Sequence, residues 1–322
     1  MIEDYEKGTL PRAKVIVKAE MDNSLTYIIK FVLEEEHPVK LIEEQSIFSE
    51  CMRANGINTA KRYKSCDKYC ISYTVNDLIY AVTVEEYLGE ELKFINYKIV
   101  DGIATLVAEM HSISQENNCH ISGNTIWDIF DETTDISRGY KAFYEYRNNG
   151  EYDFSLYDIS LYENIISLYE ERLSRLKAVW NKLPRYATQG DYSTNNLVCE
   201  NGRVAGIFDY NIAGDEILVS DMIIEGLFVC YEMDLDNGLT YDDRCKMFRV
   251  FIKKYMECRK LNQDEIAVMN DIYAVVYPFW WTRIIFDEGK SLKKYLDERN
   301  VKKVNKFFNE TYNLLHQDHF IN

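Results

Sequence analysis

The segment QGDYSTNN at residues 189–196, followed by IFD at residues 207–209, is the most informative part of this 322-residue chain. It places the acid Asp191 five residues before the amide Asn196, and a second acid, Asp209, at the end of an apolar segment. Between Asn196 and Asp209, the dipeptide Asn201-Gly202 predicts a tight turn and hence a β-hairpin. The spacing therefore predicts two acids and an amide arranged around one hairpin.

This arrangement suits the transfer of a phosphoryl group. Asp191 would orient a substrate hydroxyl and accept its proton, while Asn196 and Asp209 would supply oxygen ligands to a Mg²⁺ ion that bridges the nucleotide phosphates. Two protein ligands leave room for phosphate oxygens and water around the metal. A D-x-x-x-x-N spacing also arises by chance, and acids at strand ends are often turn caps, so the interpretation needs support from the rest of the chain.

Other motifs with an established chemistry are missing from the sequence. It contains no G-x-S-x-G, H-E-x-x-H, G-x-x-x-x-G-K-[ST] or G-x-G-x-x-G. Nucleophile-elbow hydrolases, zinc proteases, Walker-type NTPases and Rossmann enzymes therefore lose support. The eight cysteines and five histidines are scattered, which predicts free thiols rather than a metal site or a disulfide framework.

The composition bounds the architecture and the partners. One core rarely spans 322 residues, so we expect two lobes. A formal net charge of −16 argues against a nucleic-acid partner and would attract a cationic small molecule, although solubility explains it equally well. No apolar run is long enough for a membrane span, and the mixed-charge N-terminus does not resemble a secretory signal. We therefore expect no membrane partner and a cytoplasmic location, and, since no heptad seam is present, a monomer.

Residues 1–88 are expected to form a small α+β lobe. Alternating apolar and polar residues predict four strands, at residues 13–20, 25–32, 70–76 and 78–88. A turn at 21–24 joins the first two strands, and apolar residues at helical spacing predict a helix over about 38–55.

Residues 89–322 are expected to form a larger helical lobe that carries the Asp191 loop and a substrate cleft. Helical periodicity begins near Val100 and returns over about 136–181, a region that Pro184 ends. Further helices are expected over residues 219–233, 240–259, 264–287 and 291–316.

Together these features resemble the aminoglycoside phosphotransferase / choline kinase family, which has a bilobal protein-kinase-like fold and acts on small molecules. That family carries H-G-D-x-x-x-x-N, a hairpin, an I-D strand end and a further Asp twelve residues on, here Asp221. The segment AEMHSIS with His111 is similar to the family's L-A-x-L-H helix, and VTVEEYLGEE to its E-Y-x-x-G hinge strand. The resemblance covers residues from about 27 to 221. It implies an α+β, bilobal, kinase-like fold with a small β-rich N-terminal lobe and a larger helical C-terminal lobe.

The resemblance also implies residue roles. Asp191 resembles the catalytic Asp, and Asn196 and Asp209 resemble the Mg²⁺ ligands. Gln189 stands where the family usually has His, and because that position is generally a scaffold for the catalytic loop, we expect activity to survive. The N-terminal turn has no glycines, and the family's G-D-P-x-x-D segment appears here without its proline.

The nucleotide, ATP or GTP, would be held by the N-terminal lobe. Lys30 ends an apolar strand, as the family's phosphate-binding lysine does, and its partner should be a glutamate on the following helix. Glu43 and Glu44 compete for this role, and Glu44 is chosen because it shares a helix face with apolar residues. The hinge would offer backbone groups of Glu86 and Leu88 to the base.

The acceptor is the least determined part of the interpretation. Glu216 and Glu225 could meet substrate amines, and Trp280 or Trp281 could hold a cation over its ring. Packing of these tryptophans into the lobe core is the simpler alternative and is favoured. Trp127 is a second aromatic candidate.

Three functions remain open from the sequence. The first is a small-molecule kinase with a cationic, aminoglycoside-like acceptor. The second is a choline, amino-alcohol or sugar kinase of the same fold. The third is a catalytically silent kinase-like binding protein, which Gln189 and the missing glycines would motivate.

Overall fold

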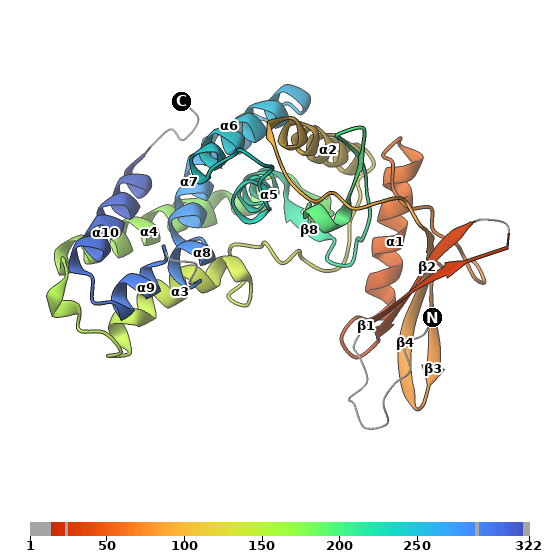
Figure 1. Cartoon of the computed structure of the whole chain (residues 1–322), viewed down its shortest axis with the longest axis horizontal. Coiled ribbons are helices and arrows are strands. Elements are labelled where there is room, and N and C mark those ends of the chain that lie inside the picture. The colour runs from red at the N-terminus through yellow and green to blue at the C-terminus, as the bar shows by residue number, and fades with distance from the viewer. Residues whose placement is uncertain (1–13, 23–24, 287–289, 318–322) are drawn as a thin grey trace. The chain divides into compact units, whose positions relative to one another are not determined.

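The computed structural model of the chain describes residues 14–22, 25–286 and 290–317 (Figure 1). Its residues form two compact units, each assembled from three stretches of chain. Unit 1 contains the described residues up to Thr125, then 186–215 and 228–259; unit 2 contains 126–185, 216–227 and the described residues from Lys260 onward. The units are thus interleaved along the sequence, whereas the expected lobes follow one another at residue 88. Unit 1 combines the strand-rich N-terminal part with the segment that carries Asp191 and Asp209.

Unit 1 begins with a four-stranded antiparallel sheet in the order β1-β2-β4-β3 (Figure 1). Its strands are β1 (Lys14–Glu20), β2 (Thr26–Leu33), β3 (Cys70–Val75) and β4 (Leu78–Glu86). They lie where the alternating pattern predicts them, although in β3 only Cys70 is buried and the rest of the strand is exposed. Asn23 and Ser24 of the predicted turn lie outside the described residues.

Helix α1 (Val39–Ala54) packs against this sheet through Val39 and Ile42, which contact a small core of strand residues. The buried side of α1 is partly polar, because it also contains Gln45, Ser46 and Ser49. Ile47, which the sequence places on the inner face, is 53% exposed. The helix is therefore rotated relative to the expected orientation, with amide and hydroxyl groups facing inward.

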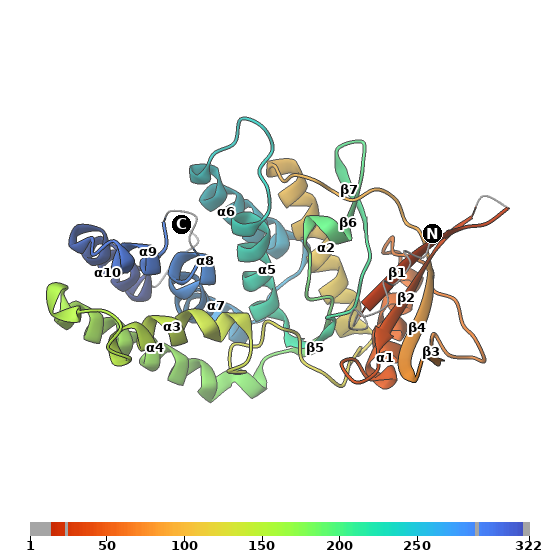
Figure 2. The same cartoon turned by 60° about the horizontal axis from the view of Figure 1, so that its bottom comes forward.

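Two further helices and a hairpin complete the part of unit 1 that supports the site. Helices α2 (Tyr97–Glu116) and α6 (Tyr241–Cys258) pack side by side, and the hairpin β6 (Leu197–Glu200)–β7 (Arg203–Ile207) lies beside α2 (Figure 2). Helix α2 begins earlier than its periodicity suggests, because the Asn96 side chain caps it. His111 is fully buried, and its Nδ1 lies 2.7 Å from Tyr255 Oη on α6, so this histidine joins the two helices.

Unit 2 is helical. Its helices are α3 (Asp135–Asn148), α4 (Ile159–Val179), α7 (Gln263–Val276), α8 (Trp281–Ile284), α9 (Leu292–Asp297) and α10 (Val301–His316), with 3₁₀ turns η1 (Phe154–Leu156), η2 (Trp180–Lys182) and η4 (Tyr277–Phe279). Helix α4 packs against α7 and α10, and α3 packs against α8. Arg172 on α4 ties this core together, since its Nη1 lies 2.5 Å from Asp271 Oδ1 on α7 and its Nε donates to the carbonyl of Leu315 on α10.

Three of the helices expected from periodicity are interrupted in unit 2. The region 136–181 is divided into α3 and α4. The helix expected over 264–287 stops at η4, because Pro278 cannot continue the helical hydrogen bonds. The helix expected over 291–316 is divided between α9 and α10, where Arg299 adopts a positive φ of 50° and Asn300 caps the second helix. Asp287, at the end of the second expected helix, lies outside the described residues.

Three elements include residues of both units: β5 (Arg185–Thr188), β8 (Gly214–Ile217) and α5 (Leu218–Glu232). The 3₁₀ turn η3 (Thr194–Asn196) lies in unit 1 and leads from the Asp191 loop into β6. Within the described ranges, no helix combines the length and apolar character that crossing a membrane requires. The eight cysteines are free thiols.

Candidate active site

The loop that carries Asp191 is held by the fully buried side chain of Gln189. Its Oε1 accepts a hydrogen bond from the Asp191 N–H at 2.7 Å, and its Nε2 donates to the Asp209 carbonyl at 2.7 Å. One amide thereby fixes the backbone of both acids. This geometry agrees with the scaffold role expected at position 189, and it shows that a glutamine has the donor and acceptor that the role requires.

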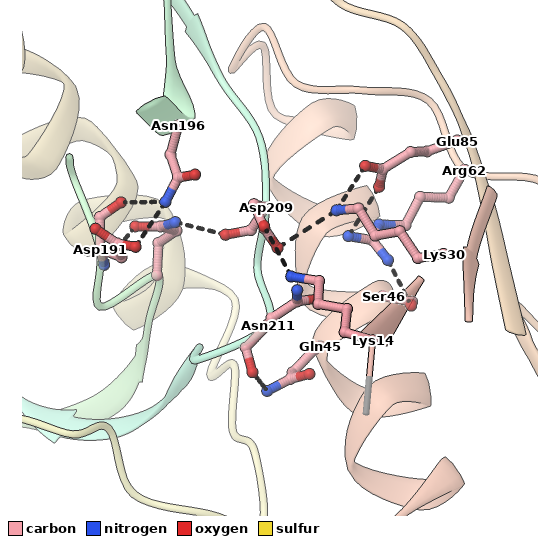
Figure 3. Close-up of polar contacts among 11 residues, drawn as sticks. Lys14, Lys30, Gln45, Ser46, Arg62, Glu85, Asp191, Asn196, Asp209 and Asn211 are labelled. Carbon is pink, nitrogen blue, oxygen red and sulfur yellow. Dashed lines mark hydrogen bonds and ion pairs between the residues drawn. The ribbon is translucent and has the colours of Figure 1, made fainter. Parts of the chain in front are cut away.

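The side chain of Asp191 is oriented by two residues that follow it, of which Figure 3 shows Asn196. Its Oδ1 accepts from the Ser193 N–H at 3.1 Å, and its Oδ2 accepts from Asn196 Nδ2 at 2.7 Å. Burial raises the pKa of Asp191 above its ordinary value, although these two hydrogen bonds lower it in part. A carboxylate with a raised pKa is a better proton acceptor, which suits a group that receives the proton of a hydroxyl.

Asp209 follows β7 and has a left-handed backbone, with φ of 58°. Asp tolerates this region better than most residues do, and such conformations gather at functional sites. Its Oδ1 lies 3.3 Å from Lys30 Nζ, and its Oδ2 lies 3.4 Å from Lys14 Nζ (Figure 3). Burial alone would raise the pKa of Asp209, but the two lysines lower it overall, so this carboxylate is charged at neutral pH.

Asn196 and Asp209 fit the chemistry of a Mg²⁺ site. The Asn196 amide nitrogen donates to Asp191, which leaves the amide oxygen as a donor atom for a metal. Asp209 supplies a charged carboxylate that already attracts two ammonium groups. In the part of the chain that the structure describes, no group of three or more His, Cys, Asp or Glu side chains is placed to hold a metal. A cation held by these two residues would therefore be completed by phosphate oxygens and water.

Lys30 lies on β2 and is only 4% exposed. Its Nζ is 2.8 Å from Glu85 Oε1 on the neighbouring strand β4 (Figure 3). Glu44, the expected partner, lies elsewhere: it accepts from the Ser122 N–H at 2.7 Å and pairs with Lys40 at 3.5 Å. The structure therefore does not bring Lys30 and Glu44 together, because the rotation of α1 turns other side chains toward the sheet.

The expected hinge lies at the end of β4. The Glu86 N–H donates to the Lys61 carbonyl at 2.9 Å, so a contact between a nucleotide base and Glu86 is left to the Glu86 carbonyl. The Tyr87 N–H is also engaged, by the Thr26 carbonyl at 2.9 Å. Within the described ranges, no backbone hydrogen bond uses either group of Leu88. The Glu86 carbonyl and the backbone groups of Leu88 are therefore the groups that could contact a nucleotide base.

The four acceptor candidates lie in unit 2, and most of them are buried. Glu216 and Glu225 are fully buried, Trp280 is nearly so, and Trp281 is half-buried. Trp127 Nε1 donates to Glu225 Oε1 at 2.8 Å, and its ring stacks on Trp280 with centroids 6.4 Å apart. The structure thus brings Glu225 and Trp280 together through Trp127. Trp127 and Trp280 thus lie in the core, as the favoured alternative expects, whereas Trp281 is only half-buried.

Glu216 has a different environment from the acids of unit 1. Burial, together with repulsion from Asp128, raises the pKa of Glu216 to about 8. The neighbouring cation Arg185 is more distant, with its Nη2 4.0 Å from Glu216 Oε1 and 3.5 Å from Asp128 Oδ2. Glu216 is therefore largely protonated at neutral pH.

Sequence reasoning missed Glu85 and Arg62. Arg62 Nη2 lies 3.1 Å from Glu85 Oε2, and its Nη1 donates to Ser46 Oγ on α1 at 2.9 Å. The available signal was the position of Glu85 near the end of a mostly apolar strand, since a charge that is buried there is retained only when it is paired. The candidate catalytic, nucleotide and metal residues all belong to unit 1.

Comparison with known proteins gives evidence at the level of the fold. Neither a protein-family model nor a curated protein sequence matches this chain. Among solved structures, an amicoumacin kinase in complex with AMP-PNP and Ca²⁺ is similar with a TM-score of 0.59 and 13% identity, over 97% of this chain and 90% of that one. A microcompartment-associated aminopropanol kinase is similar with a TM-score of 0.56 and 13% identity, over 96% and 89% of the two chains.

An aminoglycoside phosphotransferase from Alicyclobacillus acidocaldarius subsp. acidocaldarius is similar as well, with a TM-score of 0.54 and 12% identity over 93% of this chain and 90% of that one. All three neighbours are phosphotransferases by name. At these identities the similarity establishes the fold. The chain has the kinase-like fold of these proteins, with a small antiparallel-sheet N-terminal lobe and a helical C-terminal lobe.

Proposed function

We propose that this protein is a small-molecule kinase that transfers the γ-phosphate of ATP or GTP to a hydroxyl group of a cationic acceptor. The observation that carries the proposal is the arrangement around Gln189, which holds the backbone of Asp191 and Asp209 together while Asn196 bonds to Asp191. Acids and an amide in this arrangement have the groups needed to orient a hydroxyl and to hold a metal.

In this proposal each residue of the site has one task. Asp191 orients the acceptor hydroxyl and takes up its proton, for which its raised pKa is suited. Lys30 contacts the phosphates of the nucleotide. Asn196 and Asp209 hold Mg²⁺, which when bound neutralises phosphate charge. Most of the rate then comes from positioning and charge neutralisation, because the transition state of phosphoryl transfer is loose.

A cationic acceptor is supported by the charge of the chain and by the named substrates of similar folds. The formal net charge of −16 raises the local concentration of cations. The aminopropanol kinase is named for an acceptor that carries an amine together with a hydroxyl.

The test is release of ADP or GDP in the presence of Mg²⁺, measured across aminoglycosides, choline, amino alcohols and sugars. The decisive variant is Asp191→Asn, which keeps the shape of the side chain and removes the proton acceptor. We expect acceptor-dependent release to fall about a thousandfold. The matched control is Asp77→Asn, the same change at an exposed turn between β3 and β4, which leaves release unchanged.

Undiminished release in Asp191→Asn would remove this residue from the mechanism. The competing function, a catalytically silent binding protein, predicts nucleotide binding without turnover on any acceptor. Two features motivate it, Gln189 and the missing glycines of the N-terminal turn. For the first of these, the two hydrogen bonds of the Gln189 side chain hold the loop in place and do not disrupt it.

A further inference from the structure

The Lys30–Glu85 pair is a diagonal contact within the sheet. In the register of β2 and β4, Ile28 lies opposite Glu85 and Lys30 lies opposite Thr83. Lys30 is two residues from Ile28, so its side chain is on the same face of the sheet as that of Glu85. Diagonal neighbours of this kind are within reach of long side chains. The register of the two strands therefore brings the two side chains within reach of each other.

Glu85 is also held from its other side. Its second oxygen faces Arg62 Nη2 at 3.1 Å, and both side chains are almost fully buried. Among the described residues Glu85 Oε2 has no aligned hydrogen bond, so the contact with Arg62 is a charge pair. Arg62 is in turn fixed by the Ser46 hydroxyl and by the ring of Tyr210, whose centroid lies 6.0 Å from its guanidinium carbon. The carboxylate of Glu85 is thus clamped between two cations.

Helix α1 offers no competing acid to Lys30. Its buried residues are Ile42, Gln45, Ser46, Phe48, Ser49 and Met52, none of which is charged. The two acids nearest in sequence to Gln45 are used elsewhere, because Glu43 accepts from the Cys70 N–H at 2.7 Å and Glu44 accepts from the Ser122 N–H. Gln45 itself donates to the carbonyls of Asn211 and Ala213.

From this geometry we infer that Glu85 is the positioning residue for Lys30, with Arg62 fixing Glu85, so that the sheet and not helix α1 sets the lysine toward the phosphates of a nucleotide. The inference rests on the proposed function, since it assigns Lys30 a phosphate to contact. It assigns Glu85 no contact with substrate. Lys30 is poised between Glu85 at 2.8 Å and Asp209 at 3.3 Å, which directs its ammonium group to the site of the metal ligand.

The charge state of Glu85 agrees with this role. Burial by itself would raise the pKa of Glu85, but the charges of Lys30 and Arg62 lower it overall. The carboxylate is therefore ionised at neutral pH and can hold an ammonium group firmly. A neutral Gln at this position keeps the size of the side chain but loses the charge.

The experiment compares the binding of ADP, which carries phosphates, with the binding of adenosine, which carries none, by calorimetry on the full chain in the presence of Mg²⁺. In Glu85→Gln we expect ADP binding to weaken about tenfold to a hundredfold, because the lysine loses the nearer of its two charged partners, while adenosine binding changes less than about twofold. Lys30→Met sets the upper limit of the loss. Glu20→Gln, at an exposed position of β1, is the matched control with both affinities unchanged.

Glu85→Asp keeps the charge but shortens the side chain. It is the second variant, to be used if the Glu85→Gln protein does not fold. We expect it to show the same selective loss at a smaller size. Equal losses of ADP and adenosine affinity in these variants would show a purely structural role and overturn the inference. A selective loss in Glu44→Gln with none in Glu85→Gln would overturn it in favour of the helix. Wild-type protein that binds no ADP at all would overturn the proposed function itself, and the inference with it.

Discussion

The buried acids of the two units have different charged neighbours. In unit 1, Glu85 faces Lys30 and Arg62, and Asp209 faces Lys30 and Lys14. The pKa values of both carboxyl groups are lowered although burial opposes this. In unit 2, the burial of Glu216 raises its pKa to about 8. Burial is common to both sites, so the number and distance of facing cations decide the charge. Unit 1 keeps charged groups suited to phosphate chemistry, whereas Glu216 is a neutral acid at physiological pH.

The acids near Glu216 explain why it keeps its proton. Asp128 and Asp221 both raise the pKa of Glu216, and Arg185, which is partly exposed, lowers it less than burial raises it. This region therefore has more acids than bases in the immediate surroundings of one carboxyl group. We call Lys14, Lys30, Arg62, Glu85 and Asp209 the matched cluster, because its acids face cations. Removing one charge from the matched cluster is expected to lower the stability of the fold, whereas replacing the carboxyl group of Glu216 is expected to raise it.

The largest effect on stability is expected when the matched cluster loses a cation. Arg62→Leu leaves Glu85 with a buried oxygen that faces no charge, and we expect the free energy of unfolding to fall by about 4 kcal/mol. Urea-induced unfolding followed by circular dichroism measures the loss. The matched control is Arg53→Leu, which removes a partly exposed ion pair to Glu50 and costs less than about 1 kcal/mol. Losses of similar size in the two variants would mean that unit 1 does not depend on charge matching.

The second-largest effect is an increase in the free energy of unfolding, and its size depends on pH. The raised pKa of Glu216 means that the folded protein keeps a proton that the unfolded chain has released, so this group's contribution to stability is lost as the pH rises toward 8. Glu216→Gln removes the titration and can keep the hydrogen bond to the Ile217 N–H. We expect the variant to be more stable than the wild type by about 3 kcal/mol at pH 7 and nearly equal to it near pH 4.

Chemical unfolding at a series of pH values measures this difference. Glu163→Gln is the control in the same unit, because Glu163 is exposed and pairs with Arg147 at the surface. Its stability should follow that of the wild type at every pH. A stability difference for Glu216→Gln that does not grow with pH would show that Glu216 is ionised in the folded protein.

The smallest effect is expected at the edge of the matched cluster. Lys14 pairs with Asp209 at 3.4 Å, but its side chain is 38% exposed, and Lys30 still faces Asp209 when Lys14 is absent. Lys14→Ala should therefore change the free energy of unfolding by less than about 1 kcal/mol. A loss as large as that of Arg62→Leu would extend the matched cluster to the surface of the unit.

Much of the site followed from the sequence because its signals are local. The spacing of Asp191, Asn196 and Asp209 around one hairpin is fixed by a short turn, and the structure brings them together. The strands followed from alternation, which is also a local property. The family resemblance supplied the order of these parts along the chain.

The remaining features depend on contacts between distant segments. The pairing of Lys30 with Glu85 follows from the register of two strands that are far apart in sequence, and no local pattern fixes that register. The rotation of α1 was misjudged because Ile47 is apolar and exposed, while polar Gln45 is buried against carbonyls of Asn211 and Ala213. The interruption at Pro278 had a local signal in the proline itself, which the helical periodicity on either side outweighed.

The interleaving of the two units along the chain has a consequence for protein synthesis. Lys30 and Glu85 leave the ribosome early, in neighbouring strands, whereas Asp209 follows only after a long stretch of unit 2 has been made. At about 5–20 residues per second, the delay is on the order of ten seconds. During that time the nascent sheet already contains the carboxylate that its buried lysine needs. The N-terminal strands therefore pair the buried Lys30 with an acid before the Asp191 loop is made.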